Sequence, residues 1–204
     1  MFLDIDFIIY SSLLIASLLP LYIYREKIFS PKYKNNGGFA LFLKDLKFYM
    51  SKHFPKINID YSIVERTKNE PNTDLRETII VENVVEQFFN FPYIKNTQAS
   101  FPREKQWINY EEKSKSNPKY PSDWALRKEF AWRRDNKCCN RCGITLTLNE
   151  TYTSFAKEIH DGGGYNLENI IVLCVDCNKI LHSTNPKSTI SSLVLNDKLM
   201  AFVK

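Results

Sequence analysis

The sequence predicts an α+β protein with three parts: an N-terminal transmembrane helix, a small α/β middle module and a C-terminal domain stabilised by zinc. Three observations support this fold class. They are an uncharged apolar run near the N-terminus, helix-like and strand-like apolar patterns in the middle of the chain, and two Cys-x2-Cys pairs near the C-terminus. With 44% hydrophobic and 25% charged residues among 204, the composition is typical of a folded protein.

The apolar run extends from Phe7 to Tyr24, and its 18 residues include no formal charge. This length is close to that of a helix crossing a bilayer. Asp4 and Asp6 precede the run and Lys and Arg residues follow it, whereas a cleaved signal peptide begins with positive charges. Because Lys and Arg stay on the cytoplasmic side, we expect a single-pass membrane protein, anchored by residues 7–24, whose C-terminal domain is cytoplasmic. The alternative is a buried helix of a soluble protein.

The composition shifts at several points, which predicts a division into segments. Residues 39–54 carry apolar residues at helical spacing, residues 57–64 alternate as a strand does, and a second apolar stretch follows a break at 70–74. A polar, Lys-rich stretch then leads to the cysteines. The predicted segments are a transmembrane anchor (1–25), a linker (26–37), a small helix/strand module of unknown role (38–95), a basic linker arm (96–121), a zinc domain (122–185) and a C-terminal extension (186–204).

A basic helix is predicted to open the zinc domain. Ser122 or Asp123 is a candidate N-cap, and the residues from Trp124 onward contain no helix breaker. Between Lys95 and Arg141 there are 12 Lys and Arg residues against 6 Asp and Glu residues, so this window carries +6 and the rest of the chain −1, for a net charge of +5. Such a stretch is able to bind a phosphate backbone, although a solvated helix face gives the same pattern. The predicted nucleic-acid contacts are Arg127, Lys128, Arg133, Arg134, Lys137 and Arg141.

Four of the five cysteines form two regularly spaced pairs, Cys139 with Cys142 and Cys174 with Cys177. A Cys-x2-Cys pair lets two thiolates reach one tetrahedral ion, so the two pairs predict a structural Zn²⁺ site. Disulfides are not expected in a reducing cytoplasm. Redox-active cysteines and plain buried thiols are the alternatives. Cys138 adjoins the first pair but lies outside its regular spacing.

The runs YPSDWALRKEFAWRRDNKCCNRCG and GGGYNLENIIVLCVDCNKILH resemble HNH endonucleases of the zinc-knuckle type, over about residues 120 to 185. The resemblance implies a ββα-metal fold, DNA as the substrate, and Mg²⁺, Mn²⁺ or another divalent metal at the catalytic centre. Asn169 matches the asparagine that orients the general base in the family. Asn178 and His182 match two positions that bind the catalytic metal from one helix.

The sequence departs from the family where the catalytic pair is expected. HNH endonucleases carry His-His or Asp-His about seven residues before the glycine pair, and Ser154 and Phe155 stand there instead. In one interpretation His160 is a displaced base, with Glu158 or Asp161 as a displaced metal ligand, and the protein is a membrane-anchored metal-dependent DNA endonuclease. In the other, the site has decayed into a zinc module that binds nucleic acid or protein. We predict the endonuclease, because the asparagine, the helix ligand and the glycine turn stay in register.

Overall fold

The computed structural model describes residues 5–23, 36–111 and 120–203. The chain forms two compact units, Met1–Gly38 and Phe39–Lys204. The boundaries predicted after residues 95, 121 and 185 all fall inside the second unit, which holds every residue discussed as a functional candidate. Most of the predicted linker 26–37 lies outside the described residues.

Helix α1 (Ile5–Ile23) covers nearly all of the predicted transmembrane run and contains Pro20. Among the described residues, no helix is both long enough and apolar enough to cross a membrane. The transmembrane span predicted for residues 7–24 is therefore not supported, and Tyr24 lies outside the described part of the chain. The membrane location stays a prediction.

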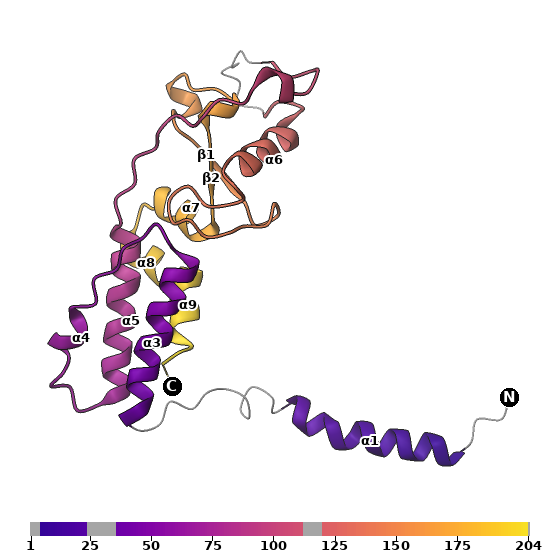
Figure 1. The fold of residues 1–204 in the computed structure, drawn as a ribbon, viewed down its shortest axis with the longest axis vertical. Helices are drawn as coiled ribbons and strands as arrows, with labels where there is room; N and C mark the ends of the chain where they lie inside the picture. The colour runs from indigo at the N-terminus through magenta and orange to yellow at the C-terminus, as the bar shows by residue number, and fades with distance from the viewer. Residues whose placement is uncertain (1–4, 24–35, 112–119, 204) are drawn as a thin grey trace. The chain divides into compact units, whose positions relative to one another are not determined.

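A helical layer forms one part of the second unit. It consists of α3 (Asn36–His53), α5 (Thr73–Asn90) and the C-terminal helices α8 (Pro186–Ser191) and α9 (Val194–Met200). Helices α3, α5 and α9 lie side by side (Figure 1). Their contact surface is apolar and completely buried, which excludes water from the layer. Its main side chains are Phe42, Leu46, Ile80, Val81, Val84, Val85, Phe88 and Leu199.

The strand predicted for residues 57–64 does not form. The short helix α4 (Ile63–Arg66) follows an irregular segment there, so the middle module is helical in its described residues. A strand needs a partner, and here a side chain takes that place. The amide of Gln87 on α5 accepts a hydrogen bond from the Asp60 backbone N–H at 2.8 Å and donates one to the Asp60 carbonyl at 2.7 Å. The alternating apolar residues face the helices without belonging to a sheet.

The zinc domain contains helix α6 (Trp124–Arg134), a two-stranded antiparallel sheet and helix α7 (Val175–Leu181). Strands β1 (Tyr152–Phe155) and β2 (Ile170–Leu173) pair with Ser154 opposite Ile171. Helix α6 packs on β2, and α7 packs on β1. Three single-turn 3₁₀ helices complete the described elements, namely η1 (Arg103–Lys105), η2 (Ile159–Asp161) and η3 (Leu167–Asn169).

Parts of the predicted linker arm 96–121 pack against the zinc domain. The Gln98 backbone N–H donates to the Glu168 carbonyl at 2.8 Å, and the Tyr110 hydroxyl accepts from the Leu167 N–H at 3.1 Å. The Trp107 indole N–H donates to the Asp123 carboxylate at 3.1 Å. Residues 112–119 of the arm lie outside the described residues. The arm therefore covers the domain instead of spacing two modules.

The helical layer contains one buried acid, Glu77 on α5, whose Oε1 has no hydrogen-bond partner among the described residues. Burial, and to a smaller extent Asp74, raises the pKa of this carboxyl to about 7. An acid with a raised folded-state pKa binds its proton more tightly in the folded protein. The protonated acid is therefore favourable below its unfolded-state pKa, and that stability is lost as pH rises through the folded-state pKa near 7.

We expect Glu77→Gln to increase the free energy of unfolding at pH 8 by about 2 kcal/mol, because it removes a charge that burial disfavours. At pH 4 the change should be close to zero, since the wild-type carboxyl is then protonated. Urea denaturation at both pH values measures this difference. The exposed Glu82→Gln on the same helix is the control, and an equal effect of Glu77→Gln at both pH values would contradict the assignment.

Candidate metal centre and active site

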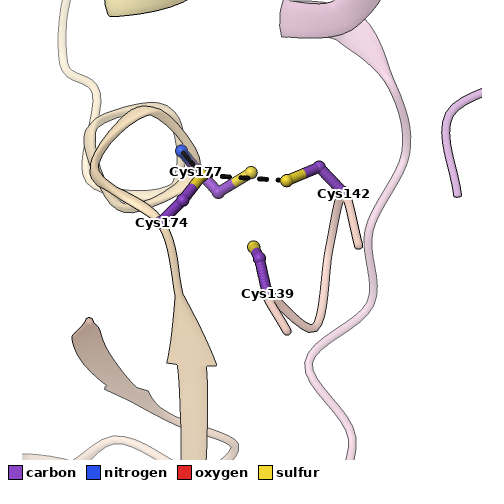
Figure 2. A group of neighbouring side chains, drawn as sticks. All are labelled: Cys139, Cys142, Cys174 and Cys177. Atoms are coloured by element: carbon purple, nitrogen blue, oxygen red, sulfur yellow. Dashed lines mark hydrogen bonds between the residues drawn. The ribbon is translucent and has the colours of Figure 1, made fainter. Parts of the chain in front are cut away.

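Four buried cysteine sulfurs from the two ends of the zinc domain meet at one point. Cys139 and Cys142 lie in the turn after α6, whereas Cys174 caps the N-terminus of α7 and Cys177 lies in its first turn. All four Sγ atoms lie within 4.8 Å of one another, and Cys142 Sγ is 3.7 Å from Cys174 Sγ (Figure 2). With Zn–S bonds of about 2.3 Å, sulfurs at tetrahedral corners are about 3.8 Å apart. The cluster therefore has the size of a structural zinc site.

The close packing of the thiols shifts the pKa values of three of them. Hydrogen bonds from Cys142, Cys174 and Cys177 lower the pKa of the Cys139 thiol. Hydrogen bonding to Cys139 is in turn the main cause that raises the pKa of Cys142 and of Cys174. Four thiolates can share this buried volume only around a positive ion, and Zn²⁺ supplies that charge.

Cys138 takes no part in the cluster. Its Sγ contacts the Asn136 carbonyl at 3.3 Å, and its backbone forms an isolated bridge with Thr145. The regular Cys-x2-Cys spacing therefore selected the correct cysteine of the adjacent pair.

Ser154 and Phe155, at the positions expected for the catalytic pair, are both inside the fold. Ser154 is 2% exposed, and its hydroxyl has no hydrogen-bond partner among the described residues. Phe155 belongs to an aromatic cluster: its ring lies 6.0 Å from that of Trp124 and 5.7 Å from that of Tyr165. The end of β1 thus contributes packing and one buried hydroxyl.

Asn169 holds the loop between the two strands. Its Oδ1 accepts from the Lys157 N–H at 2.7 Å, and its Nδ2 donates to the carbonyls of Lys157 and Gly164 at 2.9 and 2.7 Å. The buried amide is therefore fully engaged with backbone. This role fits the orienting function that the resemblance implies, and it also gives Asn169 a structural role that needs no catalysis.

The candidate displaced residues lie on this loop but do not converge on an ion. His160 has a side chain that is 78% exposed, and its Nε2 lies 3.5 Å from the Asp161 carboxylate. Glu158 accepts an ion-paired hydrogen bond from Lys95 at 2.7 Å. Apart from the cysteines, the described residues contain no group of three or more His, Cys, Asp or Glu side chains that could hold a metal.

His182 and Asn178 are one helical turn apart at the end of α7. The His182 Nδ1 lies 2.9 Å from the Asn178 carbonyl oxygen, so Nδ1 is the donor, and in the neutral ring Nε2 has the lone pair. Such a hydrogen bond fixes the tautomer that binds a metal through Nε2. The exposed ring is therefore a competent single ligand.

Half of the predicted nucleic-acid contacts are turned inward. Arg127 pairs with Asp123 at 2.7 Å and donates to the Tyr165 carbonyl, so Asp123 serves this ion pair and makes no side-chain cap for α6. Arg134 pairs with Asp135 and donates to the carbonyls of Leu167 and Ile170. Arg141 is 1% exposed. These three predictions are wrong because the guanidinium groups bind backbone carbonyls inside the fold. The remaining predicted contacts are Lys128, Arg133 and Lys137.

The glycine pair shapes the loop that Asn169 holds, and its two members differ. A Cβ on Gly163 would collide with the backbone oxygens of Lys157 and Glu158, whereas one on Gly162 would meet only the end of the Lys157 side chain. Gly162 has a φ of +85°, which an L-residue adopts at modest cost.

We expect Gly163→Ala to lower the free energy of unfolding by about 3 kcal/mol, because the backbone of the loop must move. Gly162→Ala is the matched control, with an expected loss of about 1 kcal/mol from its positive φ. Chemical denaturation of the two zinc-loaded variants compares them. Equal losses would show that the loop does not depend on the close approach at Gly163.

Comparison with known proteins gives one match. A family model described as HNH endonuclease matches residues 139–184, which begin at the first zinc ligand and include the sheet, the loop and α7. No curated protein and no solved structure matches the chain. Residues 139–184 are therefore a domain of the HNH endonuclease family, with a four-cysteine zinc-binding cluster at its centre.

Proposed function

We propose that the chain binds DNA through its HNH domain and that this domain lacks the catalytic pair with which the family cleaves it. One observation supports this function above others. The zinc cysteines, the two-stranded sheet and the hydrogen bonds of Asn169 match the family, whereas a buried Ser154 and a partly buried Phe155 stand in place of the catalytic pair. The fold of the family favours DNA as the ligand. The residues that replace the catalytic pair cannot activate water.

Geometry and charge around the loop support the loss of catalysis. A general base contributes about 10² to 10⁴ in rate, and neither a buried serine nor a phenylalanine accepts a proton from water at neutral pH. The Glu158 carboxylate is already paired with Lys95. Hard divalent cations require several oxygen ligands, and only Asn178 and His182 remain from the resemblance. Two ligands on one helix turn form an incomplete site.

An endonuclease remains the second candidate, and the state of His182 favours it. The hydrogen bond to the Asn178 carbonyl leaves Nε2 free to bind Mg²⁺, Mn²⁺ or another divalent metal, which when bound would stabilise the leaving oxygen of a phosphodiester. His160 would then take the proton from the attacking water, and Asn169 would hold the loop that carries His160. This candidate requires the exposed loop to move His160 toward α7 when DNA binds.

The binding surface that we propose consists of Lys128, Arg133 and Lys137. Lys128 and Arg133 lie on α6, and Lys137 lies just beyond its end, with its ammonium 5.2 Å from the centre of the Trp132 ring. Arg133 also pairs with Glu129 on the preceding turn. Since phosphate contacts release counterions, binding through these cations must weaken as salt rises.

We expect the full chain to bind duplex DNA and to leave a supercoiled plasmid intact with Mg²⁺ or Mn²⁺. Replacing Lys128, Arg133 and Lys137 by Gln should make the slope of log affinity against log salt shallower by about 2 to 3, close to one unit per lost phosphate contact. Fluorescence anisotropy at several salt concentrations measures the slope. Gln at Lys44, Lys47 and Lys52 on α3 is the matched control. Nicking that His160→Ala and His182→Ala both abolish would favour the endonuclease instead.

We expect the double substitution Ser154→Asp with Phe155→His to gain plasmid nicking in Mn²⁺, because it restores the pair that the resemblance places at the end of β1. The gain should reach about 10² above the wild-type background, the lower end of the contribution of a general base. Ser154→Asp with Phe155→Ala is the control for loss of the aromatic packing. A double variant that keeps its zinc and still shows no nicking would contradict a simple loss of the catalytic pair.

A further inference from the structure

One inner residue of each zinc knuckle contacts a helix end in the helical layer, and the two helix ends are of opposite polarity. Each knuckle has the form Cys-x2-Cys, and its second inner residue is Arg141 in the first knuckle and Asp176 in the second. Both side chains are buried, at 1% and 5% exposure. Neither residue binds the metal or belongs to the proposed DNA-binding surface of Lys128, Arg133 and Lys137.

Arg141 joins the first knuckle to the C-terminal end of α5. Its Nη2 donates to the carbonyls of Phe88, Phe89 and Phe91 at 2.6, 3.1 and 2.9 Å. These carbonyls form the negative end of a helix that has no basic residue in its own last turn. Arg141 therefore supplies the positive charge and the donors that the helix end lacks.

Asp176 joins the second knuckle to the opposite kind of helix end. Its two carboxylate oxygens accept from the backbone N–H groups of Val194 and Leu195, each at 2.9 Å. These are the first residues of α9, whose N-cap residue Leu193 makes no side-chain cap. An acid at a helix N-terminus and an arginine at a helix C-terminus both follow the direction of the helix dipole.

The charge of a loaded zinc site connects these caps to the metal. Zn²⁺ with four thiolates carries a net charge of −2, and a buried charge requires a partner. The Arg141 Nη1 lies 3.5 Å from Cys177 Sγ, so the guanidinium touches the cluster on one side and the end of α5 on the other. The guanidinium is therefore placed to balance part of the charge of a loaded site while it holds the end of α5.

The same knuckles also contact the turn after α3. The Lys56 backbone N–H donates to the Cys142 carbonyl at 3.3 Å, and the Lys56 ammonium donates to the Asn140 carbonyl at 3.0 Å. Residues of the zinc knuckles thus meet α5, α9 and the segment after α3. Several contacts between the layer and the zinc domain therefore lie on the two short turns that carry the metal ligands.

We propose that Arg141 and Asp176 are positioning residues through which zinc loading docks the helical layer, by fixing the C-terminal end of α5 and the first turn of α9. Zinc in this protein then orders residues far beyond the matched 139–184 segment. The proposal concerns the four-cysteine site and holds whether or not the domain cleaves DNA.

Hydrogen–deuterium exchange of the full chain, read by mass spectrometry, tests this coupling. In zinc-loaded Arg141→Met protein, amides in the last two turns of α5 should exchange at least about fivefold faster than in the wild type, the effect of losing one helix cap. Zinc content should stay at the wild-type level, because the four ligands are intact. Arg133→Met, on the exposed face of α6, is the control and should leave α5 unchanged.

Removing zinc from the wild type by chelation should speed exchange at the ends of α5 and α9 together with the knuckles. Chelation of Arg141→Met protein should add little at α5, since the connection is already broken, and this lack of additivity identifies Arg141 as the link. Additive effects would overturn the proposal, and so would wild-type protection of α5 in zinc-loaded Arg141→Met protein.

Conservative variants keep the test decisive if Arg141→Met does not fold. Arg141→Lys keeps the charge but loses the planar guanidinium, whose donors contact the cysteine cluster and the end of α5 at the same time. The amides at the end of α5 should therefore be only partly protected from exchange. Asp176→Asn loses one acceptor and should speed exchange in the first turn of α9 while α5 stays protected, with the exposed Asp197→Asn as its control. Wild-type exchange in both Arg141→Lys and Asp176→Asn would overturn the proposal.

Discussion

Four cysteine sulfurs within 4.8 Å of one another impose the constraint on which the rest of the second unit depends. A two-stranded sheet of four-residue strands is too small to be stable alone, so the ion must supply much of the free energy that holds the zinc domain together. The price is a buried double negative charge. Arg141 beside Cys177, with its other contacts at the end of α5, is the compensating group that the structure provides. Metal binding, charge balance and helix packing thus depend on the same side chain in this protein.

This domain keeps the fold of the family without its catalytic pair, because different residues determine the fold and the catalysis. Asn169 makes three hydrogen bonds to the backbone of its loop, so its loss would be costly even in a domain that never cleaves DNA. Phe155 contributes packing against Trp124 and Tyr165, which no catalytic histidine at that position could match. The register of Asn169 with the glycine turn is therefore evidence for the fold. It is weaker evidence for catalysis than the sequence alone indicated.

Local patterns identified what depends on local spacing. The two cysteine pairs, the choice of Cys139 over Cys138 and the helix from Trp124 could all be predicted from the sequence, because a few neighbouring residues determine each of them. The strand expected at residues 57–64 failed because a strand depends on a distant partner, and Gln87 occupies that place. The burial of Arg127, Arg134 and Arg141 could not be predicted from local sequence either, since their carbonyl partners lie 33 to 53 positions away in the chain. For Asp176 the sequence does carry a signal, an acid between two zinc ligands, but its partners at the start of α9 depend on the fold.

The buried arginines change what the basic window of the sequence means. An excess of positive charge between Lys95 and Arg141 indicated a cationic surface, yet Asp123 and Asp135 neutralise two of its arginines inside the fold and the metal centre is the partner of a third. The charge therefore serves first to hold the arm, the loop and the helical layer on the zinc domain. Lys128, Arg133 and Lys137 are the predicted contacts left to face a phosphate backbone, and Arg133 shares its charge with Glu129. With so few exposed cations among the predicted contacts, specific affinity for DNA would have to come largely from the shape of the HNH domain.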